Sequence, residues 1–172
     1  MRTLYLVRHD PKAWKNGKRP GGVNGHQHDP PLQMEGRPSP QLLATMQQVS
    51  PVQFDRVYTS PFLRTRQTTN MLMGALQHKP QPEVLTELGE YLGNHKRGTP
   101  ELTPDTASYY PNPLKRKLML SESIGRLELR VKKFLESLPP AGTFLVVSHG
   151  LVLSKICGQV IEEGALLVHT ID

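Results

Sequence analysis

The sequence predicts an α/β fold, a three-layer α/β/α sandwich with a mostly parallel central sheet. Short apolar runs alternate with segments of helical pattern, and this alternation favours parallel strands that are joined by helices. The apolar runs near residues 2–8, 54–59 and 143–148 are each followed by a loop and a helical pattern. A length of 172 residues and a hydrophobic fraction of 37% fit one globular domain, which we expect residues 1–172 to form.

Local signals justify the individual elements. The first strand ends at Asp10-Pro11, because the residue before proline is disfavoured in a helix and proline lacks a backbone donor. Ser60 suits a helix N-cap and Pro61 suits the first helical position. A stripe of apolar residues at helical spacing predicts a buried face of Ile124, Leu127, Val131, Leu135 and Leu138. In chain order, the expected elements are strand 2–8, helix 39–49, strand 54–59, helix 61–77, helix 122–138, strand 143–148, helix 151–161 and strand 165–171.

The composition narrows the class of partner. A formal net charge of +6 suits either nucleic-acid binding or the attraction of small anions. Because the sequence has no nucleic-acid motif, we expect a small anionic substrate. The single cysteine, Cys157, excludes an internal disulfide. No apolar run has the length of a membrane span or forms a signal-peptide core, so we expect a cytoplasmic protein with no membrane partner.

Three motifs with reactive side chains lie at the carboxyl ends of predicted strands. They are Leu6-Val7-Arg8-His9, Ser60-Pro61-Phe62-Leu63-Arg64 and Val146-Val147-Ser148-His149-Gly150. The carboxyl ends of parallel strands border the ligand crevice of an α/β sheet. In this order the motifs resemble those of the histidine phosphatase superfamily, also called the phosphoglycerate mutase-like family. The resemblance runs from residue 3 to about residue 160 and implies a phosphoglycerate mutase-like fold.

The resemblance implies a role for each matching residue. His9 corresponds to the histidine that is phosphorylated on nitrogen, and a neutral imidazole is a competent nucleophile near neutral pH. Arg8 and Arg64 correspond to two arginines that clamp phosphate, for which the planar guanidinium is suited. His149 corresponds to the second histidine, which contacts the transferring phosphoryl group. Arg66 lies two positions after Arg64 on the predicted helix, so we expect it on another face, at the surface.

The proton donor has two candidates. Leu85-Thr86-Glu87-Leu88 resembles a Leu-x-Glu segment of the family, which favours Glu87 as the acid. The family usually has a glycine four residues later, where this chain has Tyr91. Glu90, with Gly93 three residues later, is the alternative. No motif here corresponds to a metal cage, so we expect neither a metal nor another cofactor.

Two positions depart from the pattern of the family. Asp10 replaces the glycine of an Arg-His-Gly motif, and its carboxylate would repel bound phosphate unless it points away or meets a cation such as Lys12. Lys15 occupies the position of an asparagine that often contacts phosphate, and Asn16 follows it. Either Lys15 or Asn16 is therefore a candidate to bind the phosphoryl group.

The resemblance implies a phosphatase that acts on a phosphomonoester, or on protein phosphohistidine, through a phosphohistidine on His9. A mutase is one alternative, but the family's mutases resemble longer chains with a larger insertion than residues 79–120 provide. A phosphate-binding regulatory protein with weakened catalysis is another, because of Asp10 and the missing asparagine. A basic nucleic-acid-binding module is the third, although binding a phosphate backbone requires no histidine pair.

The phosphatase interpretation makes a geometric prediction. Four side chains should converge on one pocket: Arg8, His9, Arg64 and His149. The polar loops over residues 11–28 and 92–120 should surround this pocket, and their basic residues should attract anionic substrates.

Overall fold

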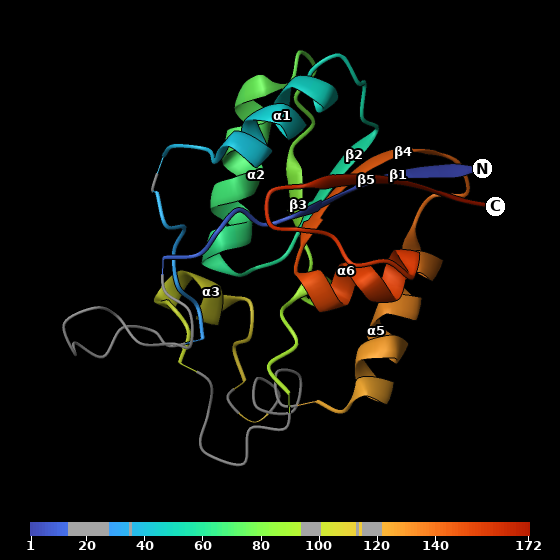
Figure 1. The fold of residues 1–172 in the computed structure, drawn as a ribbon. Helices are drawn as coiled ribbons and strands as arrows, with labels where there is room; N and C mark the ends of the chain where they lie inside the picture. Colours follow the sequence, from blue (N-terminus) through green and yellow to red (C-terminus); the bar gives the residue numbers. More distant parts are fainter. Residues whose placement is uncertain (14–27, 35, 94–100, 113, 115–121) are drawn as a thin grey trace.

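The computed structural model describes residues 1–13, 28–34, 36–93, 101–112, 114 and 122–172. A five-stranded sheet lies at its centre, with helices on both faces (Figure 1). The predicted α/β fold with a mostly parallel sheet is confirmed. None of the described helices combines the length and the apolar character that crossing a bilayer requires.

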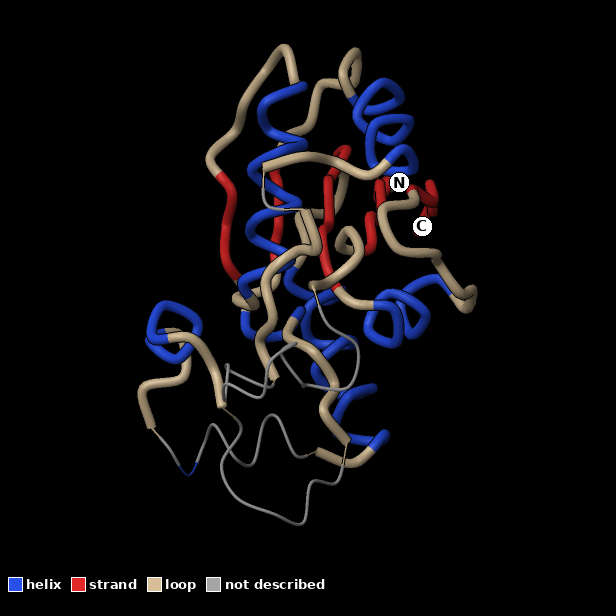
Figure 2. Tube along the Cα trace, turned by 60° about the vertical axis from the view of Figure 1, so that its left-hand side comes forward, coloured by secondary structure: helices blue, strands red, loops and turns tan. Residues whose placement is uncertain are grey.

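Most of the expected elements are present with small shifts at their ends. The strands are β1 (Arg2–Arg8), β2 (Arg56–Thr59), β3 (Pro82–Val84), β4 (Gly142–Ser148) and β5 (Leu166–Ile171). The helices are α1 (Pro40–Val49), α2 (Leu63–Ala75), α3 (Pro104–Ser108), α5 (Ile124–Ser137) and α6 (Gly150–Cys157), and η2 (Thr86–Leu88) is a 3₁₀ turn. The sequence predicted no element between residues 79 and 120, where β3, η2 and α3 lie. In Figure 2, α3 lies apart from the strands.

The register of the sheet brings three strand ends to one edge. The strand order is β3-β2-β4-β1-β5, and only β5 runs antiparallel to its neighbour among the described strands. Arg8 at the end of β1 lies opposite Ser148 at the end of β4, and Thr59 at the end of β2 lies opposite Val147. The residues that follow β1, β2 and β4 therefore leave the sheet side by side.

Alternation along β1 separates two apolar layers. Leu4 and Leu6 pack on the side of α5 and α6, whereas Val7 packs on the side of α1 and α2. All three side chains are fully buried. Because both faces of the sheet are covered, the strand ends remain the place where polar side chains can meet a ligand.

The start of α2 differs from its prediction. The sequence predicted Ser60 as the N-cap of a helix over 61–77, but α2 begins at Leu63 and its N-cap is Phe62. The Ser60 hydroxyl is instead engaged within the candidate site. Asp29, from the loop before α1, accepts a 2.7 Å hydrogen bond from the backbone N–H of Leu63 and so replaces the missing local cap.

The apolar stripe of α5 is mostly as predicted. Leu127 and Val131 are buried, and Leu138 lies in the same core just after the helix. Ile124 was predicted to be buried but is 41% exposed, because it is the first residue of the helix. Phe134 takes part in this core instead, with only 1% of its surface exposed.

The helix after β4 is shorter than predicted. The sequence predicted a helix over 151–161, but α6 ends at Cys157. Gly158 has a φ of +74°, which glycine adopts readily and which ends an α-helix. The chain can therefore turn at this point and bring residues 160–164 back toward the end of β1.

Candidate active site

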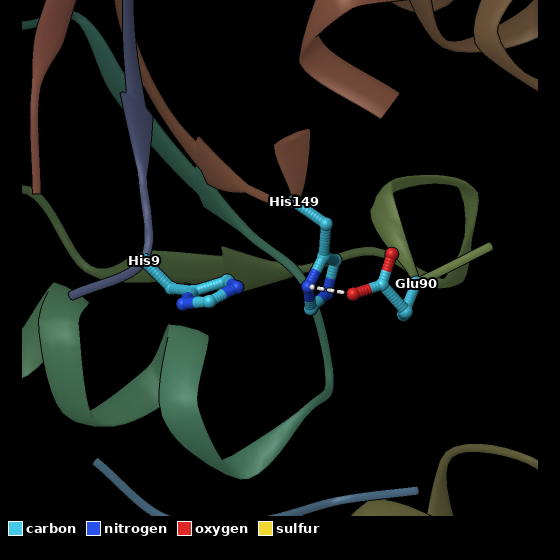
Figure 3. Close-up of side chains that lie close together, drawn as sticks. All are labelled: His9, Glu90 and His149. Atoms are coloured by element: carbon cyan, nitrogen blue, oxygen red, sulfur yellow. Dashed lines mark ion pairs between the residues drawn. The ribbon is translucent and has the colours of Figure 1, made fainter. Parts of the chain in front are cut away.

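Two histidines lie side by side at the carboxyl edge of the sheet. His9 follows β1 and His149 follows β4, and their ring centroids are 5.4 Å apart (Figure 3). The backbone N–H of His9 donates to the carbonyl of Ser148, which fixes the start of the loop after β1. Both imidazoles are buried, with 2% and 0% of their surface exposed. Two histidines far apart in the sequence thus lie in contact at one place in the fold.

The tautomer of His9 follows from its neighbour. Nδ1 of His9 lies 2.8 Å from the backbone carbonyl oxygen of Asp10, and a carbonyl can only accept a hydrogen bond. Nδ1 therefore carries the proton and Nε2 keeps its lone pair. Burial, the Arg64 guanidinium and His149 lower the pKa of His9 well below its ordinary value, so the ring is neutral at pH 7.

The carboxylate of Asp10 points away from the imidazoles. It accepts hydrogen bonds from the backbone N–H of Ser39, at 2.9 Å, and from the Ser39 hydroxyl. Ser39 is the N-cap of α1, and the amino end of a helix favours negative charge. Because the Asp10 carboxylate faces Ser39, its expected repulsion of a bound phosphate is weakened. No ion pair with Lys12 is needed for this effect.

Arg64 supplies a buried positive charge beside the second histidine. Only 2% of its surface is exposed, and its Nη2 lies 2.9 Å from Oε2 of Glu90 and 3.3 Å from Nδ1 of His149. Its Nη1 lies 3.9 Å from Oδ1 of Asp29. A guanidinium held by two carboxylates in this way is fixed in place, and its planar fork suits the binding of an anion.

Glu90 contacts both Arg64 and His149. Its Oε2 is 3.1 Å from Nδ1 of His149 (Figure 3). Burial raises the pKa of the Glu90 carboxyl, but His149 and Arg64 outweigh this effect and hold the pKa well below its ordinary value. Glu90 is therefore ionised, and its carboxylate occupies the position of an anion between two nitrogen donors.

His149 is also held from its other side. Its Nε2 lies 2.8 Å from the hydroxyl oxygen of Ser60, and Nδ1 contacts Glu90. This serine–histidine–carboxylate line has the connectivity of a hydrolytic triad. Ser60 has no exposed surface, and its hydroxyl orients the imidazole of His149. Burial lowers the pKa of His149 to about 4, against the opposing effect of Glu90.

Arg8 forms one wall of the site. Its Nη1 donates to the carbonyl of Ile161 at 3.0 Å, and its Nη2 contacts Oε1 of Glu163 at 3.3 Å. The guanidinium lies over Gly150, where a Cβ would come within 3.1 Å of the central guanidinium carbon. Glycine at this position therefore leaves room for Arg8 beside the start of α6.

A pocket of about 300 Å³ opens at this edge of the sheet. It is lined by Arg8, His9, Lys12, Glu90, Gly150, Leu151, Ser154 and Val160. Arg64 and His149 are not among the lining residues, but both are buried and both contact Glu90, which lines the pocket. The pocket has the size of a small ligand, and its cationic side chains suit an anionic one.

A metal ion would find three ligand atoms here but an unfavourable charge. One ligand atom each from His9, Glu90 and His149 lies within 4.8 Å of the others. Arg64 donates to Glu90 and approaches His149 in the same place. A fixed guanidinium at this distance opposes a cation and favours an anion, so the arrangement is better suited to phosphate chemistry than to metal binding.

Comparison with known proteins identifies the family. A family model described as the histidine phosphatase superfamily (branch 1) matches residues 4–169. The chain belongs to the histidine phosphatase superfamily.

Individual members of the superfamily are similar in sequence or in fold. The chain is 32% identical over 162 residues to "Putative phosphoserine phosphatase 2" of Hydrogenobacter thermophilus, which covers 91% of this chain and 77% of that protein. YhfR of Bacillus stearothermophilus has a TM-score of 0.68 at 20% identity, covering 100% of this chain and 92% of that one. Phosphoglycerate mutase from Bacillus anthracis str. Sterne has a TM-score of 0.63 at 19% identity, covering 98% and 88%. The two solved structures show that the fold is phosphoglycerate mutase-like.

In this histidine phosphatase superfamily member, four of the predicted site residues come together. Arg8 and His9 line the pocket, and Arg64 and His149 lie next to it. Lys12 lines the pocket as well. Lys15 and Asn16 lie outside the described residues, as do most basic residues of the two loops that were predicted to surround the site.

The geometry favours Glu90 over Glu87 as the carboxylate of the site. Glu90 contacts Arg64 and His149, whereas the carboxylate of Glu87 lies 3.4 Å from the Thr86 hydroxyl and is not among the pocket-lining groups. The carbonyl of Glu87 accepts a hydrogen bond from Arg130, which fixes the turn η2 from outside. This turn directs the next carboxylate, three residues later, into the site.

Two further residues of the site were not predicted. The sequence predicts Ser60 as a helix cap and assigns no site role to Asp29. Both act through long-range contacts, with His149 and with the start of α2. The position of Ser60 directly after a strand was the available signal. Arg66 lies apart from Arg64, with its Nε donating to the carbonyl of Pro61 at 2.9 Å.

Proposed function

We propose that this protein is a phosphatase that hydrolyses a phosphomonoester through a phosphohistidine intermediate on His9. The observation that carries the proposal is the unprotonated Nε2 of His9 at a cationic pocket, beside Arg64 and His149. Membership of the superfamily and the similarity to a protein named as a phosphoserine phosphatase support phosphatase activity.

The proposed first half-reaction transfers the phosphoryl group to His9. Nε2 of His9 attacks phosphorus, the nitrogen–phosphorus bond forms, and the bond from phosphorus to the ester oxygen breaks. The ester oxygen takes a proton from Glu90 and leaves as an alcohol. Arg8, Arg64 and His149 stabilise the charge on the nonbridging oxygens, as guanidinium and imidazole donors can.

The second half-reaction returns the enzyme to its starting state. Water attacks phosphorus and gives a proton to Glu90, while the nitrogen–phosphorus bond breaks. Inorganic phosphate leaves, and the neutral imidazole of His9 is restored. Glu90 thus acts first as an acid and then as a base, which one carboxyl group can do because each half-reaction reverses its protonation.

Glu90 must become protonated when substrate binds. In the free site its carboxylate lies between Arg64 and His149, where we propose that a phosphoryl oxygen binds. A substrate that displaces Glu90 removes the two contacts that lower its pKa. The negative charge of the phosphate raises the pKa further, so the displaced carboxyl group can carry a proton to the leaving oxygen.

The substrate is proposed as a small phosphomonoester or a phosphoprotein. A pocket of about 300 Å³ suits a small ester, and protein phosphohistidine would have to enter it by its side chain. A phosphoglycerate mutase shares the fold of this chain at 19% identity. This similarity concerns the fold alone and gives no support for mutase activity in this protein. The weakened-catalysis alternative loses one of its two reasons, because the carboxylate of Asp10 points toward Ser39.

Trapping the intermediate tests the proposal. Mixing the enzyme with labelled substrate and quenching in base should leave a phosphoryl group on His9 that is stable in alkali and lost in acid. His9→Ala should abolish the label and the turnover, because it removes the nucleophile. His78→Ala, at an exposed position, is the control and should retain both. Full turnover by His9→Ala would refute the mechanism.

A further inference from the structure

The carboxylate of Asp10 has no role in the steps above, yet it is built into the molecule. Only 3% of Asp10 is exposed. Its side chain fills the space between the end of β1, the start of α1 and the turn before β5. A Cβ on Gly164 would lie 2.7 Å from Oδ1 of Asp10 and 3.2 Å from Oγ of Ser39. Burying a carboxylate is costly unless donors surround it, so its presence calls for a function.

The donors come from one residue, the N-cap of α1. The backbone N–H of Ser39 donates to Oδ2 of Asp10 at 2.9 Å, and the Ser39 hydroxyl donates to Oδ1. The same hydroxyl oxygen accepts the N–H of Leu42, at 3.1 Å, as the cap of α1. The side chain of Asp10 is thereby tied to a helix that packs on the sheet.

The backbone of Asp10 is tied at a second point. Its N–H donates to the hydroxyl of Thr68 at 3.0 Å, and that hydroxyl donates to the carbonyl of Arg64 at 2.8 Å. Side chain and N–H together leave the peptide unit after Asp10 little freedom to rotate. Its carbonyl oxygen is the group that meets Nδ1 of His9 at 2.8 Å.

We propose that Asp10 and Ser39 are positioning residues, which hold the Asp10 carbonyl against His9 and so fix the Nδ1–H tautomer. The carbonyl selects this tautomer, because the nitrogen that meets an acceptor must carry the proton. The proposal rests on the function proposed above, in which Nε2 of His9 attacks phosphorus. The positioning proposal predicts that Nδ1 of His9 carries the proton. This prediction can be tested without measuring turnover.

The first experiment is NMR of protein labelled with ¹⁵N-histidine, in which long-range proton–nitrogen correlations report the tautomer of His9. The wild type should show the Nδ1–H form. Asp10→Gly removes the carboxylate and frees the backbone, so both tautomers should be present. Asp10→Asn keeps the shape and one acceptor for Ser39, so it should retain the wild-type form.

The second experiment measures turnover of an aryl phosphate, whose leaving group needs little protonation. Asp10→Gly and Ser39→Ala should lower kcat about tenfold, the effect of one lost ordering hydrogen bond, with KM nearly unchanged. Asp10→Asn should restore most of the rate. Ser123→Ala removes the N-cap of α5 and is the matched control, because it loses a helix cap away from the site and should keep the wild-type kcat.

Two results would overturn the proposal. One is a single Nδ1–H tautomer in both Asp10→Gly and Ser39→Ala. The other is a kcat of Ser39→Ala equal to that of Ser123→Ala. If Asp10→Gly does not fold, Ser39→Ala and Asp10→Asn decide the question alone. A wild type that shows the predicted tautomer but has no phosphatase activity would refute the proposed function and leave the positioning role intact.

Discussion

The side chains of Arg64, Glu90 and His149 form one connected polar cluster, so a change in one alters the charge of the others. Glu90 has a low pKa because His149 and Arg64 contact it, despite its burial. His149 has a low pKa because it is buried, and Glu90 opposes that shift. An anion that enters between them would rearrange all three protonation states at once.

The choice between two carboxylates can be tested at this scale. Glu90→Gln should slow the hydrolysis of alkyl phosphates roughly 10²–10⁴-fold, the usual contribution of a general acid. The loss should shrink for aryl phosphates, whose leaving groups need little protonation. Glu87→Gln is the matched control, because its carboxylate is not among the groups that line the pocket. The measurement is kcat across a series of leaving groups.

The opposite pattern would reverse this assignment. If Glu87→Gln showed the dependence on the leaving group and Glu90→Gln did not, Glu87 would be the acid. The phosphohistidine mechanism would stand in that case, because the nucleophile is a separate residue.

Among the elements, α2 depends on a residue far away in the sequence for its first turn. Asp29 accepts the N–H of Leu63 through one oxygen and the N–H and hydroxyl of Thr103 through the other. Thr103 is the N-cap of α3. One buried carboxylate therefore ties a loop to the starts of two helices, and Arg64 is the second residue of α2.

Removing this carboxylate should weaken both the fold and the site. Asp29→Ala removes the acceptor of three partly buried hydrogen bonds, and we expect a loss of about 2–3 kcal/mol in the free energy of unfolding, measured in urea. Phosphate affinity should fall as well, because Arg64 lies one residue after the capped N–H. Asp105→Ala removes an exposed carboxylate from α3 and should change stability by about 0.5 kcal/mol or less. Equal losses in the two variants would contradict the role of Asp29.

The elements that the sequence predicted well are those whose signals are local. Alternation and helical spacing located β1, β4 and α5 to within two residues, because burial on one face or both dictates the pattern. The start of α2 was wrong because its cap comes from Asp29, which no local pattern reveals. The relative position of Glu87 and Glu90 was likewise set by η2 and its contact with Arg130, a tertiary effect.

At the scale of the whole molecule, two buried neutral imidazoles link stability to pH. In the folded chain the pKa of His149 is about 4 and that of His9 is well below its ordinary value. In the unfolded chain both return to the ordinary value near 6.5. Between these values the unfolded chain binds more protons, so stability falls as the pH falls below 6.5. Protonation of Glu90 also lowers stability as the pH falls, but only near and below pH 4.5, the ordinary pKa of its carboxyl.

Stability should therefore decrease by about 3 kcal/mol between pH 6.5 and pH 5, since each buried neutral histidine contributes up to about 1.4 kcal/mol per unit of pH and two are present. Urea unfolding at pH 7.5, 6.5 and 5 measures this loss. His149→Gln should lose less over the same interval, because it lacks one of the two groups. His78→Gln, which removes an exposed histidine, should follow the wild type. A wild-type stability that stays constant down to pH 5 would show that the imidazoles are not buried as neutral groups.

The pairing of β1 with β4 also governs the order in which the molecule can assemble. The contact between Arg8 and Glu163 joins residues 155 positions apart, and the neighbours of β1 on both sides come from the last third of the chain. Closing loops of this length is entropically costly and slows folding. The strand that carries the proposed nucleophile thus leaves the ribosome before β4 and β5, the two strands with which it pairs. Until β4 and β5 have been synthesised, its apolar faces remain open to association with other nascent chains.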